Sequence, residues 1–224
     1  MKRPIIAIDG PSGAGKGTIA RTLARTLGFR HVDTGAMYRA VGWKALQEGV
    51  PLDDEPRVAA LAEGARIDVV SDVVRVDGLD VTRAIRTPEI DAASTAVARL
   101  PKVREILVAR QRELGEGGGV VMEGRDIGTV VFPDADLKIY LDASAEERTR
   151  RRLHDTAHTS GQAGHAAVAA AIDSRDKSDT TRTASPLAVA SDALRVDTTG
   201  MSIDQVVAHV LSLVRARLWD IHDS

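Results

Sequence analysis

One glycine-rich segment of the 224-residue chain has the residue types and spacing of a phosphate-binding loop. Gly10 is followed by four residues and then by Gly15 and Lys16, which is the spacing of the phosphate-loop motif. Glycine lets backbone N–H groups approach an anion closely, the start of a helix adds partial positive charge, and the lysine reaches the terminal phosphates. The segment predicts a site for ATP, built from Gly10, Pro11, Ser12, Gly13, Ala14, Gly15, Lys16, Gly17 and Thr18.

The flanking residues favour this interpretation over an ordinary glycine-rich turn. An apolar run at residues 5–8 has the length and branching of a buried strand, and apolar residues at helical spacing follow at 18–27. The loop departs from the motif where Gly17 replaces the Ser or Thr that would contact Mg²⁺. We therefore expect no direct metal ligand from the chain, with Mg²⁺ arriving on ATP. A dinucleotide-binding fingerprint fits less well, because Thr18 stands where its last glycine would be.

Arginine dominates the basic residues, with 24 arginines among 30 basic side chains, although the formal net charge is only −2. The planar guanidinium group suits phosphates, and phosphoryl transfer between two nucleotides needs several cations. Arg125 follows the apolar run at 120–122, at the edge where parallel sheets bind ligands. The chain has no Asn-Lys-x-Asp segment for guanine, which disfavours a GTPase. The arginines at expected loop positions are Arg39, Arg104, Arg125, Arg148, Arg151, Arg152, Arg175 and Arg182.

Four further segments carry a family resemblance together with the phosphate loop. They are residues 33–39 (DTGAMYR), 123–135 (EGRDIGTVVFPDA), 138–144 (KIYLDAS) and 175–179 (RDKSD). Through them, essentially the whole chain resembles the bacterial cytidylate kinases of the phosphate-loop nucleoside monophosphate kinase superfamily. The resemblance implies transfer of the γ-phosphoryl group of MgATP to CMP or dCMP, which gives CDP or dCDP and ADP.

The resemblance also implies roles for individual residues. Arg148 and Arg152 would join the phosphate loop in binding ATP. The catalytic residues would be Lys16, Arg125 and Arg182, which would stabilise the moving phosphoryl group. CMP would be bound by Thr34, Arg39, Ser94, Arg104, Arg125, Asp126, Arg175, Asp179 and Arg182.

The chemistry of cytosine supports a role for Asp126 independently of the resemblance. Cytosine has an exocyclic amine where uracil has a carbonyl oxygen, so a carboxylate accepts a hydrogen bond from the first and repels the second. Asp179 would likewise accept a hydrogen bond from a ribose hydroxyl. The alternative for Asp126 is an ordinary loop carboxylate paired with Arg125.

Two other functions fit a phosphate loop. One is a kinase of similar fold that phosphorylates UMP, AMP or a small acid. The other is a non-catalytic ATP-binding switch, which has no need of a second anion site. In each case the expected partners are small-molecule nucleotides. A nucleic acid polymer is not expected, because the chain has no basic excess, and neither is a membrane.

These side chains need a scaffold in which strands and helices alternate. Five short apolar runs predict strands, at residues 5–8, 31–33, 120–122, 137–141 and 194–196. Helical periodicity between them predicts an α/β fold, a five-stranded parallel sheet with helices on both faces. Branched residues around the Asp77-Gly78 turn predict a small β insertion at about 66–81.

We expect a single kinase unit over residues 1–224. Its core includes about 1–33, 101–147 and 183–224, and the region that binds the monophosphate includes about 34–100. A lid at about 148–164 leads into a helix that ends near 182. Closure of the lid would exclude water, because ATP hydrolysis competes with transfer.

The remaining features bear on compartment and assembly. Cysteine is absent, which excludes disulfides, and the chain shows no signal peptide or membrane span, so we expect a cytoplasmic protein. The resemblance points to a monomer. A zinc site at His154, His158 and His165 is disfavoured, because cysteine and carboxylate partners are lacking. Trp43 and Trp219 are expected to pack in the interior rather than stack on bases.

Overall fold

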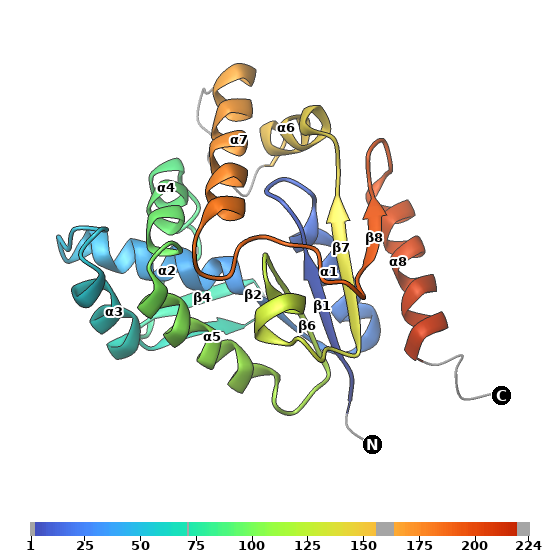
Figure 1. Ribbon diagram of the computed structural model, residues 1–224, viewed down its shortest axis with the longest axis horizontal. Helices are drawn as coiled ribbons and strands as arrows, with labels where there is room; N and C mark the ends of the chain where they lie inside the picture. The colour runs from blue at the N-terminus through green and yellow to red at the C-terminus, as the bar shows by residue number, and fades with distance from the viewer. Residues whose placement is uncertain (1–2, 71, 156–163, 219–224) are drawn as a thin grey trace.

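A parallel sheet forms the centre of the computed structural model, which describes residues 3–70, 72–155 and 164–218. The five strands run in the order β2–β6–β1–β7–β8, and helices cover both faces (Figure 1). A separate antiparallel sheet, β3–β4–β5, lies to one side. The predicted α/β fold with five parallel strands and a β insertion is confirmed.

The central strands are short, branched and buried, as expected for a sheet covered on both sides. All residues of β1 and β6 are buried. The central sheet consists of β1 (Ile5–Asp9), β2 (Arg30–Asp33), β6 (Val120–Gly124), β7 (Leu137–Asp142) and β8 (Leu194–Asp197). The insertion consists of β3 (Ile67–Val70), β4 (Val73–Val76) and β5 (Leu79–Asp80).

The helices begin at residues that suit a helix start. The side chain of Asp33 accepts from the Ala36 N–H at 3.0 Å to cap α2, and Thr87 precedes a proline at the start of α4. The helices are α1 (Lys16–Leu27), α2 (Thr34–Gln47), α3 (Glu55–Gly64), α4 (Pro88–Val97), α5 (Pro101–Gly115), α6 (Ala145–Leu153), α7 (His165–Thr181) and α8 (Ile203–Leu218). A π-helical turn, η1 (Ile127–Val131), follows β6.

Three hydrophobic clusters hold these elements together. α1 and α8 pack on one face of the central sheet, and α5 and η1 pack on the other. The third cluster joins α2, α3, α4 and α5 to the antiparallel sheet. Trp43 packs against this third cluster as predicted, while Trp219 lies outside the described residues. Because α5 contributes to two clusters, it connects the region at 34–100 to the core.

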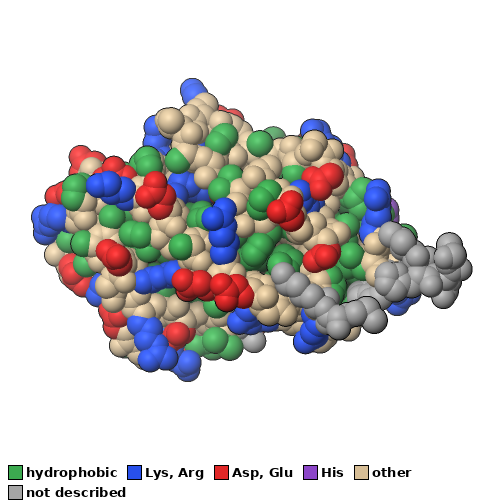
Figure 2. All heavy atoms as spheres, turned by 60° about the horizontal axis from the view of Figure 1, so that its bottom comes forward, with side chains coloured by type: hydrophobic (Ala, Val, Ile, Leu, Met, Phe, Trp, Pro, Cys, Tyr) green, Lys and Arg blue, Asp and Glu red, His purple; other side chains and the backbone are tan. Residues whose placement is uncertain are grey.

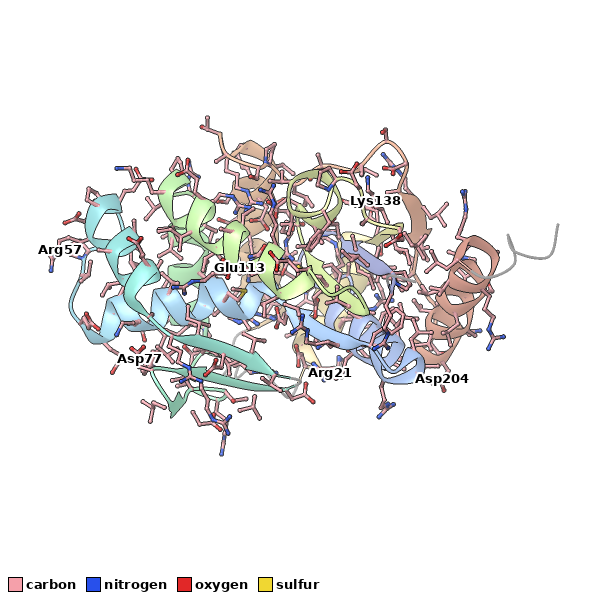
Figure 3. The ribbon with its side chains drawn as sticks, turned by 90° about the horizontal axis from the view of Figure 1, so that it is seen from below. Arg21, Arg57, Asp77, Glu113, Lys138 and Asp204 are labelled. Atoms are coloured by element: carbon pink, nitrogen blue, oxygen red, sulfur yellow. The ribbon has the colours of Figure 1, made fainter. Side chains whose placement is uncertain are left out.

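The β insertion is attached at both of its ends. Arg21 of α1 pairs with Asp72 at 2.7 Å, and Lys44 of α2 pairs with Asp77 at 2.8 Å. Figure 3 shows Arg21 and Asp77 at opposite ends of the antiparallel sheet. The insertion therefore has fixed contacts with both the core and α2.

The surface mixes charges of both signs. Figure 2 shows basic and acidic side chains interspersed over the face that it presents. Within the described residues, no helix is both long and apolar enough to cross a bilayer.

Candidate active site

The phosphate loop connects β1 to α1, and its shape depends on glycine. Gly13 and Gly15 have φ values of 80° and 87°, in the left-handed region that favours glycine. Gly10 passes so close to β7 that a Cβ atom there would lie 2.0 Å from the carbonyl oxygen of Leu141. The loop is therefore held tightly between two central strands before it enters the helix.

A cavity of about 740 Å³ opens at the carboxyl end of the central strands, where parallel sheets bind ligands. Residues 12–19 of the phosphate loop and α1 form one wall, and the ends of β2 and β6 form another. Arg39 of α2, arginines of α6 and α7, and residues at the start of α8 and just before it line much of the rest. The charged side chains facing the cavity include Lys16, Asp33, Arg39, Glu123, Arg125, Arg151, Arg152 and Arg175.

Lys16 lies in the wall of the cavity with little contact with water, since only 7% of the residue is exposed. Its Nζ donates to the carbonyl oxygen of Pro11 at 2.8 Å. Burial, reinforced by the charge of Arg125, lowers the pKa of Lys16 to about 7. A polyphosphate in the loop would restore the charged form, because it supplies the anion that the buried ammonium lacks.

Arg39 of α2 reaches the opposite wall and donates to Asp33 at 2.7 Å. Burial opposes ionisation of Asp33, but the charges of Arg39 and His31 outweigh it and hold its pKa at about 2. One carboxylate thus orients a guanidinium group toward the cavity and also caps α2.

Arg125 follows β6 and donates to Asp179 of α7 at 2.9 Å, and Arg182 approaches the same carboxylate at 3.4 Å. Arg175, on the same helix, lines the cavity, and burial lowers its pKa to about 10. These three arginines concentrate positive charge that Asp179 and the Asp91 carboxylate beside Arg175 only partly offset. An anion with several oxygens fits this arrangement.

Asp126 lies behind this group in a buried polar cluster and is only 5% exposed. It forms a close ion pair with Arg104, and Arg182 lies 3.8 Å away. Arg104 also lies over the ring of Tyr38, at 5.3 Å from its centre, and burial raises the pKa of that phenol to about 12. The alternative that Asp126 pairs with Arg125 is wrong, because Arg125 pairs with Asp179 instead.

The segment that carries Asp126 is fixed by Asp9 at the end of β1. The Asp9 carboxylate accepts hydrogen bonds from the backbone N–H groups of Ile127 and Gly128, at 2.9 and 2.7 Å. Burial raises the pKa of Asp9 to about 6, against these two hydrogen bonds. The sequence pattern did not identify Asp9 as part of the site.

The three arginines predicted for the lid lie in helix α6 and have different partners, while residues 156–163 of that predicted lid lie outside the described residues. Arg151 donates to the Ala14 carbonyl of the phosphate loop at 3.2 Å. Arg148 donates to the Ser12 carbonyl at 3.0 Å and pairs closely with Asp176, but it is not among the residues that line the cavity. Arg152 lines the cavity and pairs with Asp91 of α4. Their contact with ATP therefore stays a prediction.

Thr34 and Ser94 are buried, and their hydroxyl groups donate to backbone carbonyls. Thr34 Oγ1 donates to the backbone carbonyl oxygen of Glu123 at 2.7 Å, and Ser94 Oγ donates to the backbone carbonyl oxygen of Asp91 at 2.8 Å. Both belong to the elements around the cavity without lining it. Their contact with CMP also stays a prediction.

Three carboxylates near the cavity were missed by the sequence analysis. Glu123 lines the cavity. Asp91 pairs with Arg152, and with Arg175 at 3.3 Å. Asp176 accepts a hydrogen bond from the Ser12 N–H at 3.2 Å. Glu123 had a usable signal, because it ends a buried strand next to Arg125. Asp91 and Asp176 had none, since their contacts depend on how α4, α6 and α7 pack.

The described part of the chain holds no group of three or more potential metal ligands. His154 donates through Nδ1 to the Arg150 carbonyl at 2.7 Å, and His165 begins α7. His158 lies outside the described residues.

Comparisons with known proteins agree with this geometry. A family model described as cytidylate kinase matches residues 6–216. The chain is 48% identical to a cytidylate kinase of Solibacter usitatus, over all of this chain and 97% of that protein. It is 50% identical to a cytidylate kinase of Desulfitobacterium hafniense, over 95% and 94% of the two chains.

Solved structures show the same fold at low sequence identity. A gluconokinase from Sinorhizobium meliloti matches with a TM-score of 0.53 and 14% identity, over 96% of this chain and 94% of that one. With the phosphate loop, the basic cavity and the family match in place, the chain belongs to the cytidylate kinase family.

Proposed function

We propose that the protein transfers the γ-phosphoryl group of MgATP to CMP or dCMP, forming CDP or dCDP and ADP. The observation that carries the proposal is that one cavity has the phosphate loop on one wall and Arg39, Arg125 and Arg175 on another. Such a cavity suits the triphosphate of one nucleotide and the monophosphate of another, meeting end to end. The family match supports the choice of acceptor.

The donor side would bind ATP through the loop N–H groups and Lys16. MgATP brings the divalent ion as part of the substrate, which offsets charge on its phosphates. Lys16 would give up its hydrogen bond to Pro11 and donate to the phosphates instead. Arg148 and Arg152 would exchange Asp176 and Asp91 for phosphate oxygens as the lid closes.

The acceptor side would bind CMP between Arg39, Arg125 and the buried polar cluster. In this cluster the Asp126 carboxylate would accept from the exocyclic amine of cytosine, held in place by Arg104 and Arg182. Arg175 and Asp179 would contact the ribose, and Thr34 and Ser94 would complete the contacts. Uracil offers a carbonyl oxygen to Asp126 and would be disfavoured.

The transfer itself needs no strong general base, because the acceptor phosphate is already an anionic nucleophile. One of its oxygens attacks the γ-phosphorus, a new P–O bond forms, and the bond to the β-phosphate oxygen breaks to release ADP. Lys16, Arg125 and Arg182 would stabilise the charge on the moving group. The protein would contribute alignment, charge neutralisation and exclusion of water.

The division into core, monophosphate-binding region and lid is part of the proposal. It is supported by the separate hydrophobic cluster of α2, α3, α4 and the antiparallel sheet. The monomeric state and the cytoplasmic location stay predictions.

The decisive experiment is an ADP-release assay with CMP, dCMP, UMP, AMP or no acceptor. We expect rapid ADP release with CMP or dCMP and little with UMP, AMP or water. Preference for UMP or AMP would reassign the acceptor. Nucleotide binding without acceptor-dependent ADP release would identify a switch rather than a kinase.

A further inference from the structure

His31 and Glu123 form a buried pair beneath the phosphate loop. His31 lies on β2 opposite Val121 of β6, and Glu123 lies two residues further along β6, on the same face of the sheet. His31 Nε2 and Glu123 Oε1 are 3.0 Å apart, and each residue is only 7% exposed. α1 covers this face, so the pair lies between the sheet and the first turn of that helix.

This hydrogen bond assigns the donor role to one nitrogen of the histidine ring. A carboxylate only accepts hydrogen bonds, so Nε2 carries the proton that it shares with Glu123. The other ring nitrogen, Nδ1, is buried and has no hydrogen-bond partner within the described residues. Among those residues, Glu123 is therefore the hydrogen-bond partner that offsets the cost of burying this imidazole.

The carboxylate lies beside the position where the phosphate loop lacks a hydroxyl group. A Cβ atom on Gly17 would lie 3.2 Å from Glu123 Oε1 and 3.6 Å from Oε2. Glu123 also lines the cavity next to Lys16. The absence of a side chain at Gly17 thus leaves room for an acidic group at the place where phosphate loops have Ser or Thr.

A carboxylate that faces an anion-binding cavity is useful only toward a cation. On the chain, Lys16 and Arg125 both interact with the charge of Glu123, but Lys16 Nζ is bonded to the Pro11 carbonyl and Arg125 to Asp179. The other cation is the Mg²⁺ ion that enters with the nucleotide. Oxygen ligands, and waters held by carboxylates, are what Mg²⁺ prefers.

We propose that His31 is a positioning residue, which holds the Glu123 carboxylate toward the Mg²⁺ of the bound nucleotide and away from Lys16. The inference rests on the proposed function and adds the pair that replaces the missing hydroxyl. Without the Nε2–H donor, Glu123 would rotate toward Lys16 and neutralise it. Nucleotide binding would then lose its dependence on the metal.

The test measures ADP binding by calorimetry, once with Mg²⁺ and once in EDTA, and takes the ratio of the two dissociation constants. In the unsubstituted protein Mg²⁺ is expected to strengthen ADP binding. His31→Leu fills the buried space without a donor and is expected to reduce the ratio about tenfold. His31→Gln, which retains an N–H donor, is expected to keep the ratio within about threefold of the original. Glu123→Gln is expected to reduce it at least as much as His31→Leu.

Val210→Ala is the control, because it loosens the hydrophobic cluster on the same sheet face, in α8, without touching Glu123. Its ratio is expected to stay unchanged. An unchanged ratio in His31→Leu overturns the inference, and if that variant does not fold, an unchanged ratio in Glu123→Gln overturns it equally. Failure of the unsubstituted protein to bind ADP or to turn over CMP would instead overturn the proposed function. The result with the unsubstituted protein therefore distinguishes a failure of the proposed function from a failure of this inference.

Discussion

In the protein without nucleotide, burial disfavours the charged form of Lys16. Its pKa of about 7 is set first by burial and then by the charge of Arg125. Residues at ligand sites are commonly held in states that only the ligand relieves. Nucleotide binding should therefore be coupled to protonation of this one side chain.

The coupling predicts how ADP affinity depends on pH. Phosphates raise the pKa of Lys16 above its value of about 7 in the empty protein, so binding takes up a proton wherever the empty lysine is neutral. Affinity for MgADP should be unaffected by Lys16 below pH 7 and fall above it, by up to about tenfold per pH unit. Calorimetry in buffers of different ionisation enthalpy, between about pH 7.5 and 9, measures the uptake directly.

Lys16→Arg is the matched control, because arginine keeps its charge over this range. The variant should show neither the proton uptake nor the fall in affinity that this residue causes. A constant affinity for MgADP between pH 7 and 9 in the unsubstituted protein would contradict the account of Lys16.

Asp126 decides the base at the acceptor site if its carboxylate accepts from cytosine. Asp126→Asn should raise the transition-state free energy with CMP by roughly 1–3 kcal/mol, which lowers kcat/KM for CMP by about 5- to 150-fold. It should also reduce the preference for CMP over UMP. Steady-state kinetics with both acceptors measures the change. Asp134→Asn, at an exposed loop position, is the control. An unchanged CMP-to-UMP ratio in Asp126→Asn would count against the assignment.

The sequence predicted site residues that act directly on a ligand better than those that act on other residues. Lys16 and Arg125 were found because motif spacing and a strand end locate them, and Arg39 because of the family resemblance, although it lies in α2 and not in the expected loop. Asp9 and His31 were missed because their roles depend on backbone N–H groups or carboxylates distant in the chain. A linear pattern carries no record of such contacts.

At the scale of elements, α4, α6 and α7 meet at one carboxylate. Asp91 of α4 pairs with Arg152 of α6 and Arg175 of α7, and Figure 1 shows α4 and α7 side by side. Both arginines line the cavity, so Asp91 places a negative charge where two polyanions are proposed to bind. Nucleotides must displace this carboxylate or bind beside it.

Removal of that charge should favour nucleotide binding. Asp91→Asn is expected to lower KM for ATP and for CMP by roughly three- to tenfold, because two partly buried guanidinium groups lose a competing anion. Asp173→Asn, at an exposed position of α7, changes the net charge equally and should leave both KM values unchanged. A rise in KM for Asp91→Asn would instead show that the carboxylate holds the arginines in their productive positions.

Elements with strong local signals were predicted well. The branched runs of β1, β6 and β7 and the prolines that begin α4 and α5 gave clear positions. The π-helical turn η1 was not predicted, because it forms around the Asp9 carboxylate, which accepts its first N–H groups. That turn is specified by a contact between residues more than a hundred positions apart.

At the scale of the molecule, one continuous cavity reaches from the phosphate loop to Arg39, Arg125 and Arg175 on the proposed acceptor side, while Asp126 is not among its lining residues. A single ligand that contains both nucleosides, adenosine and cytidine joined through five phosphates, should therefore bind at least about 100-fold more tightly than ADP or CMP alone. Competition against a fluorescent nucleotide measures this affinity. The analogue with adenosine at both ends should bind more weakly, and equal affinity for the two analogues would argue against a cytosine site.

The overall architecture followed from the alternation of strands and helices, but the order of the strands did not. Nothing in the pattern indicates that β6 lies between β2 and β1, because register and neighbours depend on how all the helices pack. That order brings Glu123 next to His31 and Arg125 next to the phosphate loop. The site is therefore a product of topology as much as of motif.

The same strand order has a consequence during synthesis of the chain. β1 pairs with β6 and β7, and β2 pairs with β6, so residues 5–33 are synthesised before the strands that pair with them. At about 5–20 residues per second, β6 follows roughly 4–17 s later. In that interval most of the cluster around α2, α3 and α4 is already available to collapse. The nascent chain is thus expected to fold around α2, α3 and α4 before β1 and β2 have strand partners.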